Sequence, residues 1–214
     1  MQNEAGAFCN NRPVLEAGDL ECERGGRTLF RGLTFVLRPG DLVRVAGPNG
    51  SGKSSLLRIL CGLLAPTAGE VRWKGEPIGS LKEEYSRELV YLGHAAGVKD
   101  DLSAAENLDI ACRVAGQAAR ADSIQEALSR LAVPQGPVLR RLSQGQRRRA
   151  ALARLALSGA AALWLLDEPF SGLDDRGVAL LNDLFTQRLA KGGMIVFTTH
   201  QDPGIAAARV IELG

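Results

Sequence analysis

The chain has 214 residues, 45% of them hydrophobic and 23% charged, a balance typical of a globular domain with a sizeable core. Its formal net charge of +2 is too small to indicate a nucleic acid or an anionic membrane surface as a partner. No run reaches the ~18 apolar residues of a membrane-spanning helix, and residues 1–12 contain no apolar segment of the kind that secretory signals need.

The first predicted elements are two strands that lead into a glycine-rich loop. Residues 29–37 and 42–46 have strand patterns, and an Arg-Pro-Gly-Asp turn at residues 38–41 separates them. A helix is expected to follow the loop from about Ser54. It is indicated by apolar residues at helical spacing, which are Leu56, Ile59, Leu60, Leu63 and Leu64.

The middle of the chain, between about residues 95 and 142, has helical signals and no strand signal. Ser103 with Glu106 forms a capping-box pattern, and so does Asp122 with Gln125. We therefore expect a pair of helices here, forming a helical subdomain inserted into the rest of the fold.

Two short apolar runs follow, at residues 163–166 and 194–198. Such runs are typical of central strands in a parallel sheet that is covered on both faces. Together with the earlier strand, loop and helix they predict a doubly wound α/β fold.

The cysteines are scattered without a C-x-x-C pair: Cys9, Cys22, Cys61 and Cys112. This spacing favours reduced thiols in a cytosolic protein over a metal site or a disulfide framework.

The strongest chemical signal is a complete G-x-x-x-x-G-K-S phosphate-loop motif. Its residues are Gly47, Pro48, Asn49, Gly50, Ser51, Gly52, Lys53 and Ser54. The glycines let the backbone wrap around a polyphosphate with its amide N–H groups pointing inward, and the following helix presents its positive end to the same anion. Lys53 adds a charge for the β- and γ-phosphates, and the Ser54 hydroxyl suits Mg²⁺. The motif predicts a nucleotide site.

An acidic pair follows the apolar run at residues 163–166. A carboxylate there lies at the carboxyl edge of the sheet, where ligands of α/β proteins bind. Asp167 is expected to hold Mg²⁺, directly or through water, and Glu168 is the candidate general base that polarises the attacking water. Because acidic residues commonly end strands, the pair alone is a weak signal for a catalytic site. It becomes a strong signal because a phosphate loop precedes it in the chain.

A third motif distinguishes among proteins with phosphate loops. Leu142-Ser-Gln-Gly-Gln146 precedes a helix that bears three consecutive arginines, residues 147–149. With this motif the chain resembles the ABC ATPase family, whose signature has the form L-S-x-G-Q. Ser171-Gly-Leu-Asp174 fits the family's D-loop, and His200 fits its switch histidine. The resemblance covers nearly the whole chain, with the motifs in the family's order.

The resemblance implies a P-loop NTPase core with a mostly parallel sheet, a small antiparallel β region and an inserted α-helical subdomain. It implies a single ABC ATPase domain at residues 14–214, after an N-terminal extension of residues 1–13. The core would comprise residues 14–94 and 153–214, and the helical subdomain about residues 95–152.

The resemblance also implies roles for single residues. Two subunits would close head to tail as a homodimer around two ATP molecules with Mg²⁺. Ser143 and Gly145 would contact the γ-phosphate held by the other subunit, a role that suits a helix N-terminus. His200 would brace the γ-phosphate and orient the water. Gln146 and Asp174 belong to the same nucleotide-contacting set, whereas the three arginines are interpreted as mostly structural.

The chain departs from the family's pattern at two positions. An aromatic residue usually stacks on adenine, but Arg24 stands at the matching place, judged from the spacing to Phe35. A guanidinium can also stack on a base, with looser base selectivity. A glutamine that touches Mg²⁺ usually follows the strand before the helical subdomain, and here the sequence is Tyr91-Leu-Gly-His94. A histidine can still ligate or hydrogen-bond, so we expect His94 beside the metal, near the surface that faces the membrane partner.

Several local strings resemble one branch of the family, the ATP-binding subunits of haem exporters in bacterial cytochrome c maturation. They include Tyr91 to His94, Glu106-Asn-Leu108 and Trp164. This resemblance implies a peripheral subunit on the cytoplasmic face of the bacterial inner membrane, bound to integral membrane transporter subunits. ATP hydrolysis would be coupled to haem delivery or to release of the haem chaperone. The resemblance implies neither direct haem binding nor nucleic-acid binding by this chain.

Three other functions remain open at this point. They are an ABC ATPase for another cargo, a soluble ABC protein that acts on nucleic acid, and a small-molecule kinase with the same phosphate loop. ABC proteins of the second kind generally carry long coiled coils, zinc-binding cysteines or two cassettes, none of which is visible in this sequence. The kinase leaves the motif at residues 142–146 unexplained.

Overall fold

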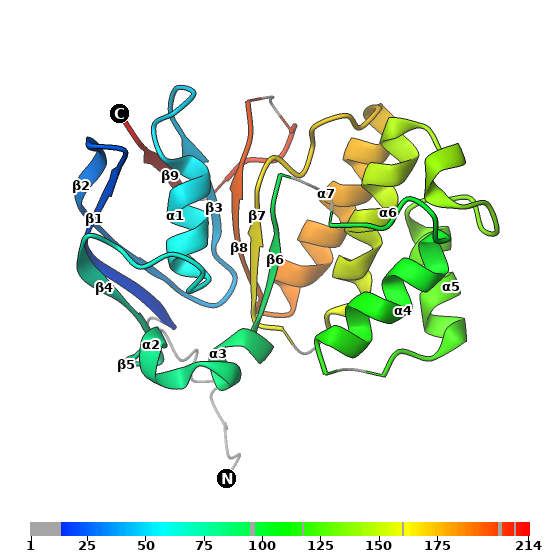
Figure 1. The fold of residues 1–214 in the computed structure, drawn as a ribbon, viewed down its shortest axis with the longest axis horizontal. Helices are drawn as coiled ribbons and strands as arrows, with labels where there is room; N and C mark the ends of the chain where they lie inside the picture. The colour runs from blue at the N-terminus through cyan, green and yellow to red at the C-terminus, as the bar shows by residue number, and fades with distance from the viewer. Residues whose placement is uncertain (1–13, 95–96, 117, 160, 201–202, 208) are drawn as a thin grey trace, which may run out of the picture.

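The computed structural model describes residues 14–94, 97–116, 118–159, 161–200, 203–207 and 209–214. The expected N-terminal extension, residues 1–13, and the first two residues of the expected helical subdomain, 95 and 96, lie outside these ranges. The described residues form two β-sheets, with one helix between them and a group of helices beside the larger sheet (Figure 1). Within these ranges, no helix is both long enough and apolar enough to cross a bilayer.

The larger sheet has five strands in the order β6-β7-β8-β3-β9, and all neighbouring pairs are parallel. The strands are β3 (Leu42–Ala46), β6 (Leu89–Leu92), β7 (Leu163–Leu166), β8 (Met194–Thr198) and β9 (Arg209–Glu212). The strands predicted at residues 42–46, 163–166 and 194–198 are confirmed with those bounds. β7 is apolar throughout, and β8 is apolar up to Thr198, because their alternate side chains enter apolar clusters on opposite faces of the sheet.

The smaller sheet is antiparallel, with the order β2-β1-β4-β5. Its strands are β1 (Leu15–Arg24), β2 (Arg27–Leu37), β4 (Ala68–Trp73) and β5 (Glu76–Pro77). The strand expected from residue 29 begins earlier because Arg27 pairs with Arg24 across the hairpin. The helix α1 (Lys53–Leu60) buries its apolar side between the two sheets, and α2 (Ile78–Leu81) and α3 (Glu83–Arg87) connect β5 to β6. The predicted combination of a parallel sheet, a small antiparallel sheet and helices is confirmed.

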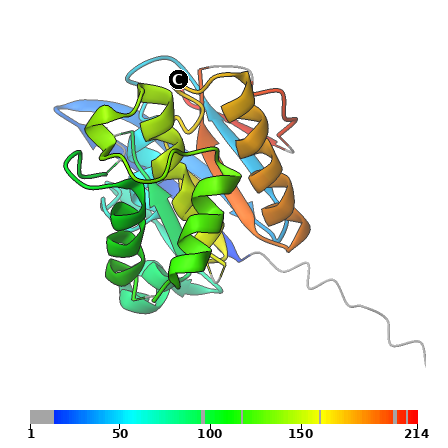
Figure 2. The ribbon, with the colours of Figure 1, turned by 90° about the vertical axis from the view of Figure 1, so that its right-hand side faces the viewer.

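Three helices, α4 (Ala104–Val114), α5 (Ala121–Arg130) and α6 (Gln144–Leu157), pack against one another beside the larger sheet, with the short 3₁₀ helix η1 (Leu139–Arg141) before α6 (Figure 2). The capping box of Ser103 and Glu106 is confirmed at the start of α4. The one expected at Asp122 is wrong. Arg120 is the N-cap of α5, so Asp122 lies within the first turn, where its charge favours the positive helix end.

The helix α7 (Asp175–Ala190) covers the face of the larger sheet opposite α1. Its Phe185 packs edge to face against Phe170 and Phe197, with ring centroids 5.7 Å apart in both pairs. Phe170 belongs to the segment that leaves the carboxyl end of β7, and its side chain is fully buried. This aromatic cluster therefore anchors the segment that carries the acidic pair.

Candidate active site

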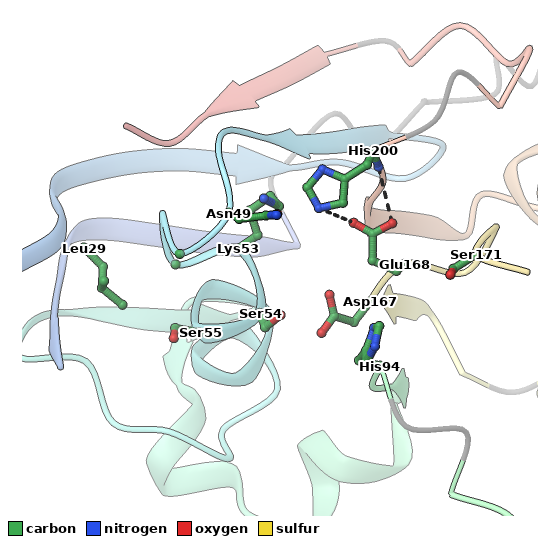
Figure 3. Close-up of a pocket in the computed structure, with 12 residues that line it drawn as sticks. Leu29, Asn49, Lys53, Ser54, Ser55, His94, Asp167, Glu168, Ser171 and His200 are labelled. Atoms are coloured by element: carbon green, nitrogen blue, oxygen red, sulfur yellow. Dashed lines mark hydrogen bonds and ion pairs between the residues drawn. The ribbon is translucent and has the colours of Figure 1, made fainter. Parts of the chain in front are cut away.

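A cavity of about 470 Å³ lies at the carboxyl ends of β3, β6, β7 and β8 (Figure 3). Parallel strands end at the same edge of a sheet, so four segments that are distant in sequence meet here. The residues predicted from the motifs that line the cavity are Asn49, Gly50, Gly52, Lys53, Ser54, His94, Asp167, Glu168 and His200.

Lys53 begins α1 and lies under the phosphate loop, where it is only 8% exposed. Its Nζ donates to the carbonyl oxygens of Gly47 and Pro48 at 2.7 and 2.9 Å. A buried ammonium needs such acceptors, and a phosphate oxygen would be a stronger, charged acceptor in the same place. The loop is therefore arranged to hold this cation where an anion can take over its hydrogen bonds.

Two glycines of the loop occupy positions that exclude a side chain. Gly47 has a φ of 139°, and a Cβ there would lie 2.2 Å from the carbonyl oxygen of Leu213. Gly52 has a φ of 100°, and a Cβ there would approach Leu29 and Phe30 to 3.0 and 3.1 Å. Only glycine allows the backbone to follow this path, which leads from the end of β3 directly to the N-terminus of α1.

Asp167 follows β7 and presents a buried carboxylate to the cavity, being 3% exposed. Its Oδ1 accepts a hydrogen bond from Thr198 Oγ1 at 2.8 Å, whereas its buried Oδ2 has no hydrogen-bond partner among the described residues. A buried carboxylate oxygen without a donor is costly, and a cation would satisfy it. In the described ranges, no group of three or more acidic, histidine or cysteine side chains is arranged so that it could hold a metal ion by itself. Asp167, with Ser54 in the same cavity, therefore fits a cation that also binds phosphate oxygens.

Glu168 and His200 form a pair at the other end of the cavity from Leu29 (Figure 3). His200 Nε2 lies 3.2 Å from Glu168 Oε1, and the His200 amide N–H donates to Oε2 at 3.3 Å. The Glu168 side chain is 14% exposed and the His200 side chain 51% exposed, so the carboxylate is sheltered behind the imidazole. Glu168 has a φ of 50°, uncommon for a residue other than glycine, and its N–H donates to Thr198 Oγ1 at 2.8 Å.

Four other predicted residues, Ser143, Gly145, Gln146 and Asp174, are not among those that line this cavity. Ser143 is the N-cap of α6 and forms a reciprocal capping box with Gln146, with bonds of 3.2 and 2.9 Å. A Cβ on Gly145 would lie 3.0 Å from the Gly172 carbonyl oxygen, so the start of α6 packs on the segment after β7.

Asp174 caps α7 by accepting from the Gly177 N–H at 2.9 Å, and its Oδ1 also accepts from Arg149 Nη1 at 2.8 Å. The Gly177 N–H, aided by the Arg149 guanidinium, lowers the pKa of this carboxyl below its usual range. Asp174 is thus fixed as an ion between the N-terminal parts of α6 and α7.

The structure adds two residues to the cavity that the motifs did not indicate, Leu29 and Ser55, and it also places Ser171, the first residue of the D-loop motif, in the lining. Arg24 is exposed at the end of β1 and is not among the lining residues. Leu29 on β2 lines the cavity on that side. Its apolar type and its position five residues after Arg24 gave no distinct signal in the sequence.

A family model described as ABC transporter matches residues 30–171 of this chain. The cytochrome c biogenesis ATP-binding export protein CcmA of Aromatoleum aromaticum is 50% identical over 196 residues, which cover 91% of this chain and 92% of the relative. The protein of the same description from Pseudomonas aeruginosa is 44% identical over 203 residues, covering 94% of this chain and 100% of the relative.

Solved structures share the fold over most of the chain. A putative ABC transporter ATP-binding protein from Pyrococcus furiosus has a TM-score of 0.81 at 26% identity and covers 93% of this chain and 96% of its own. The ATP-binding cassette MJ0796, solved as a dimer bound to ADP and Pi, has a TM-score of 0.77 at 24% identity and covers 94% of each chain. From the family match and the near full-length relatives, this chain belongs to the ABC transporter ATP-binding family and, within it, to the cytochrome c biogenesis ATP-binding export proteins.

Proposed function

We propose that this chain binds and hydrolyses ATP as the ATP-binding subunit of a haem exporter complex in cytochrome c maturation. The observation that carries the proposal is the convergence of the phosphate loop, the buried Asp167 and the paired Glu168 and His200 in one cavity. Together they supply a cradle for a polyphosphate, a carboxylate for a cation and a base beside the reacting phosphate. Membership of the ABC transporter family supports the coupling of this reaction to transport.

The phosphate loop would bind the triphosphate of ATP, with the γ-phosphate toward Glu168 and the adenine toward Leu29. Lys53 would exchange the loop carbonyls of Gly47 and Pro48 for β- and γ-phosphate oxygens. The remaining loop residues, Asn49, Gly50, Ser51 and Gly52, would offer backbone N–H groups, and the N-terminal end of α1 would favour the negative charge.

Asp167 and Ser54 would hold Mg²⁺ against the phosphates, with His94 at its edge. When bound, the ion would neutralise charge on the β- and γ-phosphates. The unpartnered Oδ2 of Asp167 supports this assignment, because it is a buried acceptor directed toward the cavity.

Glu168 would act as the general base. It would take a proton from a water molecule while the water oxygen bonds to the γ-phosphorus and the bond to the ADP oxygen breaks. His200 would hold a γ-phosphate oxygen and orient the same water. The 3.2 Å separation of His200 Nε2 and Glu168 Oε1 supports this division of roles, because it places the imidazole directly beside the carboxylate that would take the proton.

Two copies of the chain would complete each site as a head-to-tail homodimer. Ser143, Gly145 and Gln146 at the start of α6, with Asp174, would face the nucleotide of the partner subunit. The N-terminal end of α6 supports this role, since it lies outside the chain's own cavity and a helix start attracts anions. A fold neighbour, the cassette MJ0796, was solved as a dimer.

The dimer would sit on the cytoplasmic face of the inner membrane against integral transporter subunits. Closure on ATP would move the helical subdomain, about residues 95–152, against the core of residues 14–94 and 153–214, and so would move the membrane partner. The names of the CcmA relatives, which are cytochrome c biogenesis export proteins, support haem handling as the purpose. Haem itself would be held by the partner chains, and no nucleic acid would take part.

The activity is tested with Glu168→Gln in the full chain. The variant should bind ATP, release no phosphate and accumulate as a dimer in ATP, because the base is lost while the binding groups remain. Lys53→Ala should instead lose ATP binding. Phosphate release by Glu168→Gln at the wild-type rate would refute the assignment of the base.

The cellular role is tested by measuring covalently bound haem on c-type cytochromes in host cells without this chain. Haem attachment should be lost, restored by the wild-type chain, and not restored by Lys53→Ala. Normal attachment in the deleted cells would refute the role in cytochrome c maturation and leave an ABC transporter ATPase with another cargo.

A further inference from the structure

Arg148 extends from α6 into the segment that carries the candidate base. Its Nη2 donates to the carbonyl oxygens of Glu168 at 2.6 Å and of Asp167 at 3.1 Å. Its Nε donates to the Pro169 carbonyl at 3.4 Å, and its Nη1 to the His94 carbonyl at 3.5 Å. One guanidinium therefore joins three separate parts of the chain, which are α6, the turn after β7 and the segment after β6.

This guanidinium is partly buried. Burial lowers the pKa of Arg148, and the nearby Asp167 and Glu168 carboxylates counteract this effect only in part. A buried charge is tolerated where fixed dipoles solvate it, and the four carbonyl groups serve that purpose here. Such a planar fork of donors is specific to arginine, because lysine carries its charge at one point.

The contact matters because of the backbone conformation of Glu168. Its φ of 50° is a left-handed conformation that persists only when the surroundings enforce it. The Glu168 N–H is held by Thr198 of β8, and the Glu168 carbonyl is held by Arg148 of α6. The turn that positions the Glu168 side chain is thus hydrogen-bonded to β8 through the Glu168 N–H and to α6 through the Glu168 carbonyl.

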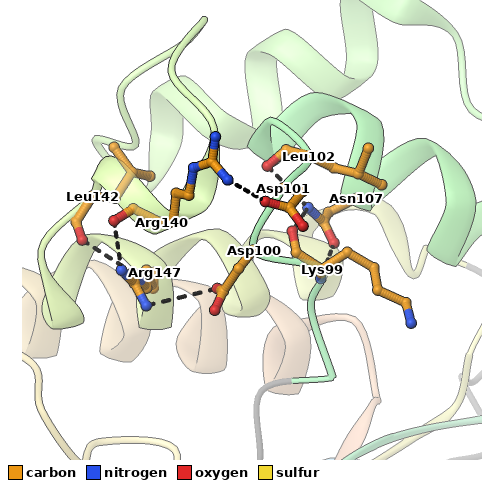
Figure 4. A network of polar contacts seen from close by, with 8 residues as sticks. All are labelled: Lys99, Asp100, Asp101, Leu102, Asn107, Arg140, Leu142 and Arg147. Atoms are coloured by element: carbon orange, nitrogen blue, oxygen red, sulfur yellow. Dashed lines mark hydrogen bonds and ion pairs between the residues drawn. The ribbon is translucent and has the colours of Figure 1, made fainter.

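The two neighbouring arginines make different contacts. Arg147 donates to the carbonyl oxygens of Arg140 and Leu142 and approaches Asp100, all within the helical part of the chain (Figure 4). Arg149 binds the carboxylate of Asp174. Among the described residues, Arg148 is the one of the three consecutive arginines that donates to the acidic turn.

We propose that Arg148 is a positioning residue that couples the placement of α6 to the geometry of Glu168 in the same chain. It touches neither the nucleotide nor the reacting water in this assignment, and it acts through the Glu168 carbonyl. The inference rests on the proposed ATP hydrolysis. Since α6 begins at the signature motif, a shift of α6 on engaging the partner's nucleotide would move one of the donors that hold the Glu168 carbonyl, and this would couple the two nucleotide sites.

The test compares three variants of the full chain, assayed alone and in membranes that contain its transporter subunits. Arg148→Met keeps the length of the side chain and removes every donor, and Arg148→Lys keeps the charge but cannot span four carbonyls. Arg154→Met is the matched control. Arg154 lies on the same helix and its pKa is likewise lowered by burial, but it lines a cavity with Ser86 and Arg87 on another side of the molecule.

The measurements are kcat, KM for ATP, the Hill coefficient for ATP and the thermal midpoint. Arg148→Met should lower kcat at least about tenfold and bring the Hill coefficient for ATP toward one, while KM changes less than about twofold. Arg148→Lys should have values of kcat and of the Hill coefficient between those of Arg148→Met and of the wild type. Arg154→Met should lower the thermal midpoint with kcat within about twofold of the wild type.

A wild-type kcat and Hill coefficient in Arg148→Met would overturn the positioning role while leaving the proposed ATPase intact. Equal losses of kcat in Arg148→Met and Arg154→Met at equal thermal midpoints would also overturn it, because the effect would then be general destabilisation. A wild-type chain that hydrolyses no ATP, with or without its membrane partners, would refute the proposed function itself.

Discussion

Thr198 Oγ1 donates a hydrogen bond to Asp167 Oδ1 over 2.8 Å and so joins the carboxyl ends of β8 and β7. The same oxygen accepts the Glu168 N–H, also at 2.8 Å. Thr198 is fully buried, so water cannot replace these bonds. A single hydroxyl therefore orients both members of the acidic pair.

Replacement of this hydroxyl should impair hydrolysis more than binding. Thr198→Val preserves the shape but leaves a carboxylate oxygen and an amide N–H unpaired, which should lower the free energy of unfolding by about 2 kcal/mol. We expect kcat to fall about tenfold with a smaller change in KM, measured by phosphate release. Thr198→Ser keeps the hydroxyl and should retain most of the activity. A wild-type kcat in Thr198→Val would show that Asp167 and Glu168 are oriented by other contacts.

The end of the cavity at Leu29, where the nucleobase of ATP is expected, should accept an aromatic side chain that stacks on the nucleobase. No described phenylalanine, tyrosine or tryptophan lines the cavity, so a nucleobase at this end would meet the aliphatic side chain of Leu29. Leu29→Trp should tighten ATP binding by about 1 kcal/mol, since stacking on a base contributes ~1–3 kcal/mol. Titration with ATP and GTP measures this gain. If Leu29→Trp has no effect on ATP binding while Arg24→Ala weakens it, the nucleobase is held by Arg24 instead.

His94 should affect coupling more than nucleotide binding. Its backbone carbonyl is held by Arg148, and its exposed side chain lines both the nucleotide cavity and the neighbouring cavity beside α6. His94→Gln should therefore keep ATP affinity near that of the wild type and change ATPase stimulation by the membrane partner. Both quantities can be measured in reconstituted membranes. Unchanged stimulation and unchanged transport would contradict this role.

The capping box of α4 should contribute stability that depends on pH. The Ser103 N–H, with the Ser103 hydroxyl, lowers the pKa of Glu106 below its usual value of 4.5. The ionised carboxylate therefore stabilises the folded chain above that value, and this contribution is lost as the pH falls through the lower pKa of the folded state.

Denaturant unfolding of the wild type and of Glu106→Gln across this acidic range provides the measurement. The stability of the wild type should decline more steeply below pH 4.5 than that of the variant. Ser103→Ala should show an intermediate decline, since it removes the hydroxyl partner but keeps the Ser103 N–H. Parallel curves for all three proteins would exclude a contribution from this carboxylate.

Local sequence was sufficient wherever consecutive residues determine the structure. The phosphate loop was readable because its glycines, Lys53 and Ser54 act within eight neighbouring residues, and the apolar runs of β7 and β8 predicted their own bounds. The capping box at Ser103 was likewise local. The one expected at Asp122 failed because the N-cap of α5 is Arg120, two residues earlier than the N-cap that the pattern required.

Contacts between distant segments were decided by the tertiary structure alone. Thr198 and Asp167 are 31 residues apart, and Arg148 and Glu168 are 20 apart, so no spacing in the chain predicts either bond. Three consecutive arginines looked like one surface feature, yet the helical turn directs Arg147, Arg148 and Arg149 to three different partners. The sequence by itself determined which chemical groups this protein has and the order in which they occur. The parallel sheet and the packing of α6 decided which of them meet, because hydrogen bonds depend on separation in space and not along the chain.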